Sequence, residues 1–320
     1  MKKIFTLLII IVLLIIPQTA CNSQNNNMGI EKTSFHLDTV CKITIYSMEG
    51  LDGKSEDEQR QRALTVITEA FKLCDEYENI LSNMREGTDI YRLNHAGGKP
   101  VEVSDAAVEV IEKGIEYGRL SEGRFDITIG GVSKLWDFHQ RNEAGEKVGS
   151  VPDSGVLQEA VSHVNYENIK IEGNTVQLLD PEAEIDLGGI AKGYIADKVA
   201  EFLESEGVTG ALVSLGGNIV AIGEKGESME NGTGKEFYVG IGDPDSDTGQ
   251  LLGIIPCKDK TVVTSGTYER YFEADGQKYH HVLNPDTGYQ QDTDLVSATV
   301  IAPKGSSCLL YTSPSPRDTE

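Results

Sequence analysis

The most informative segment of the sequence reads Ile185-Asp-Leu-Gly-Gly-Ile-Ala-Lys-Gly-Tyr-Ile-Ala-Asp197. A carboxylate, two glycines and a lysine precede apolar residues at helical spacing, which predicts a strand-to-helix junction and a helix ending at Gly207. Glycine permits close approach of a ligand, and a helix N-terminus presents N–H groups to an anion. The two standard nucleotide-binding glycine motifs are absent here. From these residues alone, a plain junction and a phosphate site are equally good interpretations.

The surrounding sequence predicts a mixture of helices and strands. Apolar residues recur at helical spacing from Ala63 to Leu81 and again after Ser104-Asp105, a pair that can cap a helix. Residues 40–46 alternate between apolar and polar side chains, as in a half-buried strand. Further strands are expected at 211–215, 219–222, 238–241, 261–264 and 295–302, with a hairpin across Asp275-Gly276. Since these elements do not repeat as β-α-β units, the expected fold class is α+β, with mixed helices and antiparallel sheet in one domain.

The overall charge excludes one class of partner. The chain has 320 residues, with 28 Lys and Arg against 51 Asp and Glu, so its formal net charge is −23. Such an acidic surface repels phosphate backbones, and no Lys/Arg cluster offsets it, so we expect no nucleic-acid partner. A small anionic substrate would need local compensation from a cation or a helix N-terminus.

The N-terminus has the pattern of an export signal. Lys2 and Lys3 precede an apolar run that is shorter than the roughly 20 residues needed to cross a bilayer. Small residues then lead to Cys21, which indicates a signal peptide at 1–20 and lipidation of Cys21. Ordinary cleavage that leaves an unmodified Cys21 is the alternative. Residues 21–33 are expected to form a polar tether outside the cytoplasm, with the protein anchored to the membrane by lipid.

The other cysteines do not indicate a disulfide framework. Of five cysteines, Cys41, Cys74 and Cys257 are far apart in sequence, and no C-x-x-C pair occurs. Neither a zinc site nor a redox motif is therefore supported. Cys41 and Cys74 fall on apolar faces, where a buried thiol acting as a small hydrophobe is expected.

The C-terminal residues 308–320 fit no element of the predicted fold. Residues 308–318 can be back-translated to the transposase adaptor that is used to fragment DNA for sequencing. We therefore expect this tail to be foreign and the natural sequence to be interrupted near Ser307. A natural Pro/Ser-rich tail is the alternative.

Three other segments carry polar residues that could act in a site. Phe125-Asp126 follows Gly123 in a polar loop, Thr264-Ser-Gly266 ends a strand, and His281 precedes a turn rich in Asn, Pro, Asp and Gly. Taken singly, each has an ordinary structural explanation: an Asp that caps, a turn that ends a strand, and a His that faces solvent.

The order of the motifs is more specific than any one of them. From about Ser34 to Ala302 the chain resembles the ApbE family of FAD:protein FMN transferases. The resemblance rests on these segments: Asp38-Thr-Val, Ile80-Leu-Ser82, Tyr91-Arg-Leu-Asn94, Ser121-Glu-Gly-Arg-Phe-Asp126 with Leu135-Trp136, Ile185 to Asp197, Leu215-Gly-Gly217, Gly240-Ile-Gly-Asp-Pro244, Thr264-Ser-Gly266 and His281 to Gly288. The resemblance implies an ApbE-like, T-fold-related single domain over 34–307.

The resemblance also implies a set of site residues. The positions expected to contact FAD are Leu37, Met84, Arg124, Phe125, Asp126, Asp186, Lys192 and Leu283. Met84 stands where an aromatic residue often stacks on the flavin, and Leu37 stands in place of Met, so both keep an apolar surface. The Gly189 carbonyl is expected to bind Mg²⁺, and the other metal ligands of the family, an Asp and a Thr, belong after Ala302.

The implied reaction moves FMN from FAD to a Ser or Thr hydroxyl of a target flavoprotein and releases AMP. Lys192 would stabilise charge on the pyrophosphate, and His281 would act as base or phosphate contact. The acceptor would be a flavoprotein such as a subunit of a redox-driven ion pump. Two alternatives remain: a metal-dependent FAD pyrophosphatase that uses the same site, and a non-catalytic flavin-binding lipoprotein, for which two similar α/β lobes would be expected.

Overall fold

An antiparallel sheet of 6 strands forms the middle of the molecule, in the order β1-β2-β6-β7-β10-β13. The computed structural model describes residues 29–51, 53–138, 148–225, 236–244, 246, 248–291 and 293–305. The strands of this sheet are β1 (Ile30–His36), β2 (Thr39–Met48), β6 (Val208–Leu215), β7 (Asn218–Gly223), β10 (Lys260–Gly266) and β13 (Ser297–Pro303). Every neighbouring pair is antiparallel, as expected.

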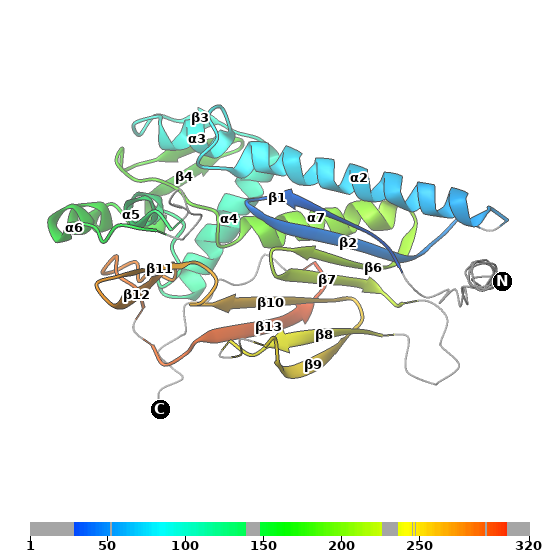
Figure 1. Cartoon of the computed structure of the whole chain (residues 1–320). Helices are drawn as coiled ribbons and strands as arrows, with labels where there is room; N and C mark the ends of the chain where they lie inside the picture. The colour runs from blue at the N-terminus through cyan, green and yellow to red at the C-terminus, as the bar shows by residue number, and fades with distance from the viewer. Residues whose placement is uncertain are drawn as a thin grey trace, which may run out of the picture.

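Long helices cover one face of this sheet (Figure 1). They are α2 (Glu56–Leu81) and α7 (Ala191–Ser205), and α4 (Asp105–Leu120) packs against α2 beside them. Ile43 of β2, Ile67 of α2 and Val199 of α7 are each 0% exposed in the shared core. Burying one such side chain contributes about 1.5–3 kcal/mol. The helices begin where capping predicts, with Ser104 capping α4 and Ser55 forming a capping box with Glu58 at α2.

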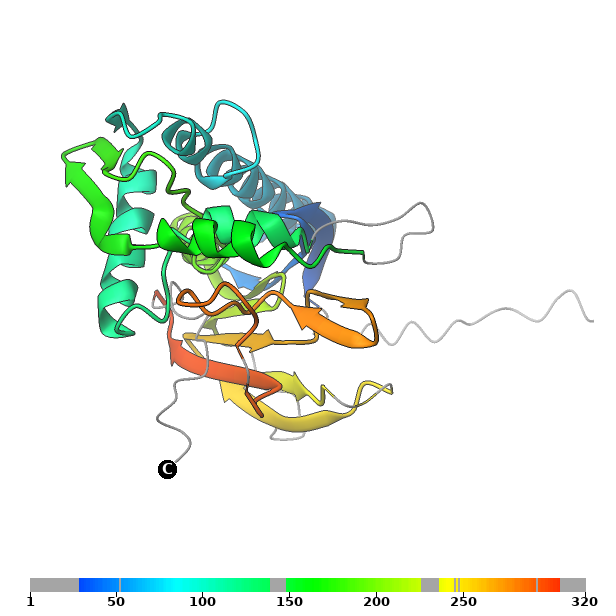
Figure 2. The same ribbon diagram turned by 90° about the vertical axis from the view of Figure 1, so that its left-hand side faces the viewer.

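Smaller elements gather at one end of the sheet (Figures 1 and 2). They are α3 (Asp89–Asn94), β3 (Val101–Glu102), α5 (Gly130–Trp136), α6 (Ser154–Ser162), the 3-10 helix η1 (Tyr166–Asn168), β4 (Ile169–Glu172), β5 (Thr175–Leu178), β11 (Tyr271–Ala274) and β12 (Gln277–His280). A second apolar cluster around Trp136 joins α5, α6 and the β11–β12 hairpin. The Trp136 Nε1–H donates to the Gly288 carbonyl at 2.8 Å, which ties the segment after the hairpin to α5.

A hairpin of β8 (Phe237–Gly242) and β9 (Leu251–Cys257) packs against the other face of the sheet (Figure 1). Its inward side chains, including Phe237 and Cys257, share a third cluster with Ala221 and Val262. One helical layer and one hairpin thus enclose the antiparallel sheet. This is one α+β domain, not a pair of similar α/β lobes.

The strands β1, β3, β4, β5 and β9 were not predicted, and one expected boundary was wrong. β1 begins at Ile30, so residues 30–33 belong to the sheet and not to a tether. Their side chains are mostly exposed and polar, so the sequence shows no strand pattern here. The strand is held by backbone pairing with β2. β9 is exposed on its outer side and contains Pro256, which obscured its pattern. The other predicted strands, helices and the hairpin turn at Asp275-Gly276 are confirmed, with ends shifted by a few residues.

The cysteines of the described chain are unpaired, and Cys41, Cys74 and Cys257 are each buried as free thiols. Burial raises the pKa of Cys41 to about 11 and that of Cys74 to about 12, so both stay protonated and inert. Within the part of the chain that the structure describes, no helix has the length and apolarity to cross a membrane. The predicted signal peptide, Cys21 and the segment 308–320 lie outside the described residues.

Candidate functional site

The N-terminus of α7 has no side-chain cap. Its N-cap residue is Ile190, whose side chain makes no capping hydrogen bond, and the first turn contains no acidic residue. The N–H groups of Ile190 and Ala191 donate to the Leu187 carbonyl at 2.9 and 2.8 Å. No carboxylate within the first turn of the helix compensates the positive end of its dipole, which suits this end to an anionic ligand.

Asp186 is held rigidly in front of this helix. Its backbone N–H donates to the Ile127 carbonyl at 2.8 Å. One carboxylate oxygen accepts from the Gly188 N–H at 2.8 Å, and the other accepts from the Ser133 hydroxyl at 2.9 Å. A Cβ on Gly188 would lie 3.0 Å from the Asp186 Oδ1 atom, which explains the glycine.

The residue before Asp186 is anchored from a distant helix. The Asn94 side chain donates to the Ile185 carbonyl at 2.9 Å and accepts from the Ile185 N–H at 2.7 Å. Asn94 ends the Tyr91-Arg-Leu-Asn94 motif, so this motif acts by fixing the backbone of the site segment.

The Asp126 carboxylate accepts hydrogen bonds from other groups of the protein. It is 6% exposed and accepts from the Thr128 N–H at 2.8 Å, the Thr128 hydroxyl at 2.6 Å and the Tyr166 N–H at 2.9 Å. Burial raises the pKa of this carboxyl, and the three donors oppose that effect. The carboxylate thus satisfies local donors, in line with the capping interpretation, and any FAD contact by this residue stays a prediction.

The two residues before Asp126 differ in exposure. Arg124 is exposed and follows a turn in which Glu122 and Gly123 have positive φ. Phe125 is half-buried and meets Tyr117 edge-on with ring centroids 6.3 Å apart. Their contacts with FAD also stay predictions.

The tip of the β1–β2 hairpin is the most strained backbone in this region. Leu37 and Asp38 both have φ of 55°, and only their pair of residues separates the two strands. A bulky residue such as Leu rarely adopts this conformation, which is typical of strained functional segments. The Leu37 N–H donates to the Glu78 Oε2 atom at 3.3 Å, and this oxygen also lies 3.0 Å from the Arg85 guanidinium.

Glu78 therefore brings together two segments expected to contact the flavin. Arg85 follows Met84, whose side chain is 78% exposed. The Ser82 hydroxyl accepts from the N–H groups of Met84 and Arg85, each at 3.2 Å, and fixes this turn. An exposed, flexible Met beside the hairpin tip provides an apolar surface on which an aromatic ring could lie.

His281 lies close enough to Lys192 to feel the lysine charge. Burial lowers the pKa of His281 to about 3, and the Arg270 charge acts in the same direction. The ring is half-buried, which contradicts the default expectation of a solvent-facing His. Its Nδ1 lies 3.2 Å from the Arg270 carbonyl, so Nδ1 carries the proton and Nε2 is the acceptor nitrogen of a neutral imidazole.

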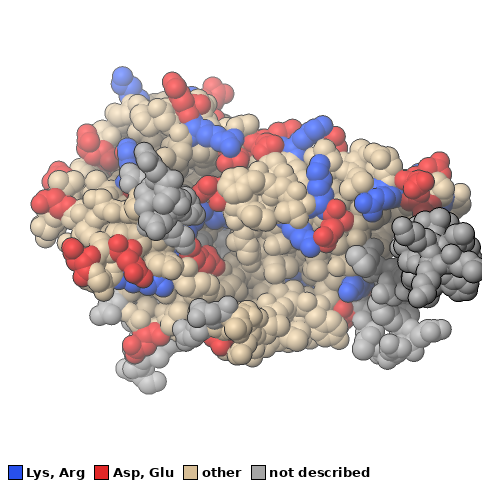
Figure 3. Space-filling model, in the orientation of Figure 1, with Lys and Arg blue, Asp and Glu red and all other residues tan. Residues whose placement is uncertain are grey.

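Lys192 lies in the first turn of α7. Its pKa is lowered to about 8, mainly by burial and also by the Arg270 charge, while the carboxylates of Glu269, Asp186 and Asp38 act in the opposite direction. The lysine thus shares one electrostatic environment with Asp186 and the hairpin tip. Arg270 and Glu269 were not singled out in the sequence, and neither was Glu78. In the space-filling view, acidic and basic side chains are interspersed over the face shown, without a continuous patch of either sign (Figure 3).

Leu283 lies two residues beyond His281 and is 7% exposed within the Trp136 cluster. Its backbone forms an isolated bridge with Gln290. The side chain therefore supports the segment that carries His281, and its expected contact with FAD stays a prediction.

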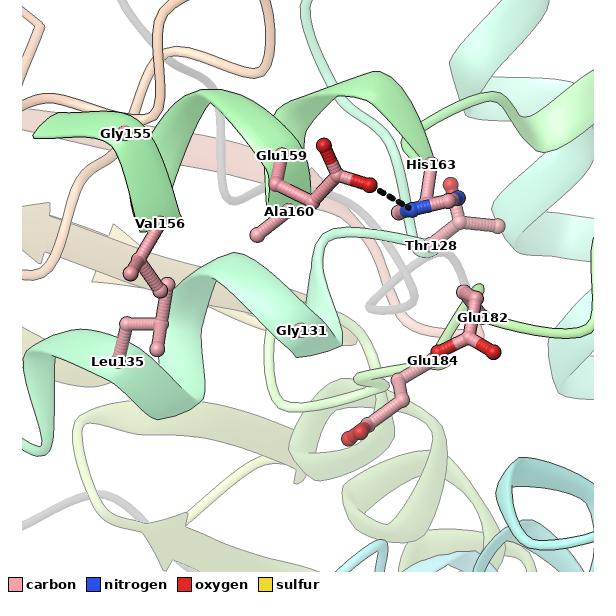
Figure 4. Close-up of a pocket in the computed structure, with 10 residues that line it drawn as sticks. All are labelled: Thr128, Gly131, Leu135, Gly155, Val156, Glu159, Ala160, His163, Glu182 and Glu184. Atoms are coloured by element: carbon pink, nitrogen blue, oxygen red, sulfur yellow. Dashed lines mark ion pairs between the residues drawn. The ribbon is translucent and has the colours of Figure 1, made fainter.

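A separate pocket of about 730 Å³ lies between α5 and α6 (Figure 4). Its polar lining includes Glu159, whose carboxylate is 3.6 Å from the His163 ring. His163 also contacts Asp180 at 2.8 Å, and this hydrogen bond raises its pKa. None of the residues expected to contact FAD lines this pocket, so it is distinct from the predicted flavin site.

The described residues do not make a complete metal site. Between Gly29 and Gly305, leaving the gaps aside, no three His, Cys, Asp or Glu side chains are grouped so that they could hold a metal ion. A single carbonyl at Gly189 is a poor donor set for Mg²⁺, which requires octahedral oxygen coordination. The residues expected to complete it belong after Ala302, where the description ends at residue 305.

Comparison with known proteins gives this arrangement a context. The profile of the ApbE family matches residues 37–310. The chain belongs to the ApbE family. It is 31% identical over 89% of its length to the FAD:protein FMN transferase of Treponema pallidum, of which it covers 77%. It is 35% identical over 74% of its length to a FAD:protein FMN transferase of Klebsiella pneumoniae, of which it covers 70%.

Solved ApbE structures have the same fold. The crystal structure of the ApbE protein of Thermotoga maritima superposes with a TM-score of 0.73 at 29% identity, covering 87% of this chain and 83% of that one. The flavin transferase ApbE of Vibrio cholerae gives a TM-score of 0.69 at 28% identity, covering 87% and 82%. The ApbE-like α+β fold expected from the motif order is thereby confirmed.

Proposed function

We propose that this protein transfers FMN from FAD to a Ser or Thr hydroxyl of a target flavoprotein and releases AMP. The observation that carries the proposal is that Lys192, His281 and the hydrogen-bonded Asp186 lie within electrostatic range along a chain of neighbours, beside a helix N-terminus without a side-chain cap. Membership of the ApbE family and the names of its relatives support the same reaction.

The chemistry follows from the protonation states. The acceptor oxygen attacks the phosphorus of the FMN half, a new P–O bond forms, and the P–O bond to AMP breaks. The hydroxyl proton passes to the acceptor nitrogen Nε2 of His281. Lys192 is positively charged below its pKa of about 8 and can offset charge on the pyrophosphate oxygens. The helix N-terminus adds fixed N–H dipoles on the same side.

A divalent cation such as Mg²⁺ is part of the proposal, since the doubly charged pyrophosphate enters a protein with net charge −23. When bound, the cation would neutralise phosphate charge, with the Gly189 carbonyl as one ligand. Chelation of divalent cations is expected to abolish transfer, and added Mg²⁺ to restore it.

We also propose that the protein works outside the cytoplasm, anchored by lipid at Cys21. The basic, apolar and small-residue pattern of residues 1–21 supports this location. The change Cys21→Ala is expected to move the mature protein from the detergent phase to the aqueous phase in a detergent partition assay. Wild-type protein found wholly in the aqueous phase would contradict the anchor.

The function is tested with a version of the protein in which the Asp- and Thr-bearing segment expected from the family replaces residues 308–320. This protein is incubated with FAD, Mg²⁺ and a candidate acceptor, such as a flavoprotein subunit of a redox-driven ion pump. We expect ultraviolet-fluorescent flavin on the acceptor after denaturing electrophoresis, and none when the acceptor Ser or Thr is changed to Ala. Production of AMP and soluble FMN without labelling would instead identify an FAD pyrophosphatase. Flavin binding without turnover would identify a binding protein.

A further inference from the structure

Arg270 stands beside His281 at the open end of the β11–β12 hairpin. Its carbonyl accepts from the His281 N–H at 3.1 Å and lies 3.2 Å from the His281 Nδ1 atom. These two contacts fix the backbone of Arg270 relative to the imidazole. Its side chain therefore starts from a defined position at the site.

The guanidinium reaches towards the strained hairpin tip. Its Nη2 atom lies 3.8 Å from the Asp38 Oδ2 atom, and the Arg270 side chain is 29% exposed. This separation is longer than a hydrogen bond, so the two groups attract each other without forming the forked, bidentate geometry of a strong pair. Asp38 is 63% exposed, so solvent weakens this attraction further.

A second cation lies close by. The Arg270 charge acts on Lys192, and both charges act on His281. These two cations repel each other, and the Glu269 carboxylate offsets part of their charge. A pyrophosphate with two negative charges would offset more of it. A guanidinium with five N–H donors is well suited to two phosphate oxygens at once.

We propose that Arg270 binds the pyrophosphate of FAD, and that Asp38 holds the guanidinium in place before the substrate enters. The inference rests on the proposed function, because it assigns a further substrate contact to the same site. Asp38 belongs to the hairpin tip that also carries Leu37, so the pair links the expected flavin surface to the reacting phosphate.

The test separates contact with phosphate from support of the fold. Dissociation constants for FAD and for riboflavin, which lacks the pyrophosphate, are measured by flavin fluorescence for wild type and for Arg270→Gln. Loss of a charge-assisted contact is expected to weaken FAD binding by about ten- to a hundredfold. Riboflavin binding is expected to change less than about twofold, within the range of surface substitutions.

A matched control and a conservative variant complete the design. Arg62→Gln removes an arginine paired with Glu206 at 2.6 Å on α2 and is expected to leave both constants unchanged. Arg270→Lys keeps the charge but not the fork, so it is expected to recover part of the FAD affinity, and it replaces Arg270→Gln if that variant unfolds. Equal weakening of FAD and riboflavin, or no weakening, would overturn the assignment. Failure of the wild type to bind FAD would overturn the proposed function as well.

Discussion

Some residues of this site are expected to contact the substrate, and others hold those residues in position. Asp186 faces the N-terminus of α7, but both of its carboxylate oxygens also accept hydrogen bonds. Asp126 is more fully committed to the protein, with three donors on a carboxylate that is 6% exposed. The part-exposed Asp186 carboxylate can therefore still meet a ligand, whereas the buried Asp126 carboxylate satisfies local donors.

The hydroxyl of Ser133 is expected to position Asp186 for substrate. Ser133→Ala removes the donor at 2.9 Å and should weaken FAD binding by up to about tenfold, because a hydrogen bond to a charged group contributes at least about 1.5 kcal/mol and part of that loss is recovered by solvent. Thermal stability should change little, since the site is part-exposed. Ser162→Ala removes a hydroxyl that bonds only its own helix backbone and serves as control. The same FAD affinity for both variants in a calorimetric titration would show that Asp186 needs no such support.

The titration of Lys192 should set the upper pH limit of the reaction. Its pKa in the folded protein is about 8, below the usual 10.5, because burial and Arg270 disfavour the charge. The ammonium is therefore lost as pH rises through about 8, and kcat/KM should fall there. Lys192→Arg keeps its charge, so the falling limb should move to higher pH. An unchanged limb in Lys192→Arg would assign it to another group.

At the scale of elements, the site is a junction of three parts of the chain. The segment before α7 carries Asp186, the β1–β2 hairpin tip carries Leu37 and Asp38, and the β11–β12 hairpin carries Arg270 and His281. Helix α5 supports the first of these, because the Gly130 N–H donates to the Glu184 carbonyl at 2.9 Å. The position of one small helix thus determines where Asp186 lies.

Two adjacent glycines of α5 allow a matched test of this support. A Cβ on Gly130 would lie 2.6 Å from the Glu184 carbonyl oxygen, whereas one on Gly131 would meet nothing within 4 Å. Gly130→Ala should therefore displace the segment before Asp186, weaken FAD binding and destabilise the fold by about 1–3 kcal/mol. Gly131→Ala should stabilise the helix by up to about 1 kcal/mol and leave binding unchanged. Chemical denaturation and FAD titration of both variants decide the matter, and equal behaviour would contradict the proposed support.

Much of the sheet and helix layer could be predicted, because buried side chains repeat with a clear period. In β2, Cys41, Ile43 and Ile45 face the core, and in α7 the spacing from Ile195 to Leu203 marks the buried side. β1 could not be predicted, since its polar side chains carry no such period and backbone pairing holds it. Arg270 and Glu78 also escaped prediction. Their partners lie far away in sequence, and an ion pair across such a distance leaves no local pattern.

For the molecule as a whole, a net charge of −23 repels the anionic substrate that we propose for it. The fold offsets this repulsion locally by gathering Lys192, Arg270 and a helix N-terminus where three segments meet. Long-range attraction does not bring FAD to this protein, so affinity must come from short-range contacts. Binding should accordingly depend on residues of the site far more than on surface charge elsewhere.

The most direct test of FMN transfer is a balance of products in one reaction. The protein, with the Asp- and Thr-bearing segment expected from the family in place of residues 308–320, is incubated with FAD, Mg²⁺ and acceptor. The acceptor is analysed by intact mass spectrometry, and AMP and soluble FMN are quantified by chromatography. We predict one FMN added per acceptor, AMP in equal amount, and no soluble FMN above the level without enzyme. Soluble FMN appearing in step with AMP, while the acceptor mass stays unchanged, would contradict the account.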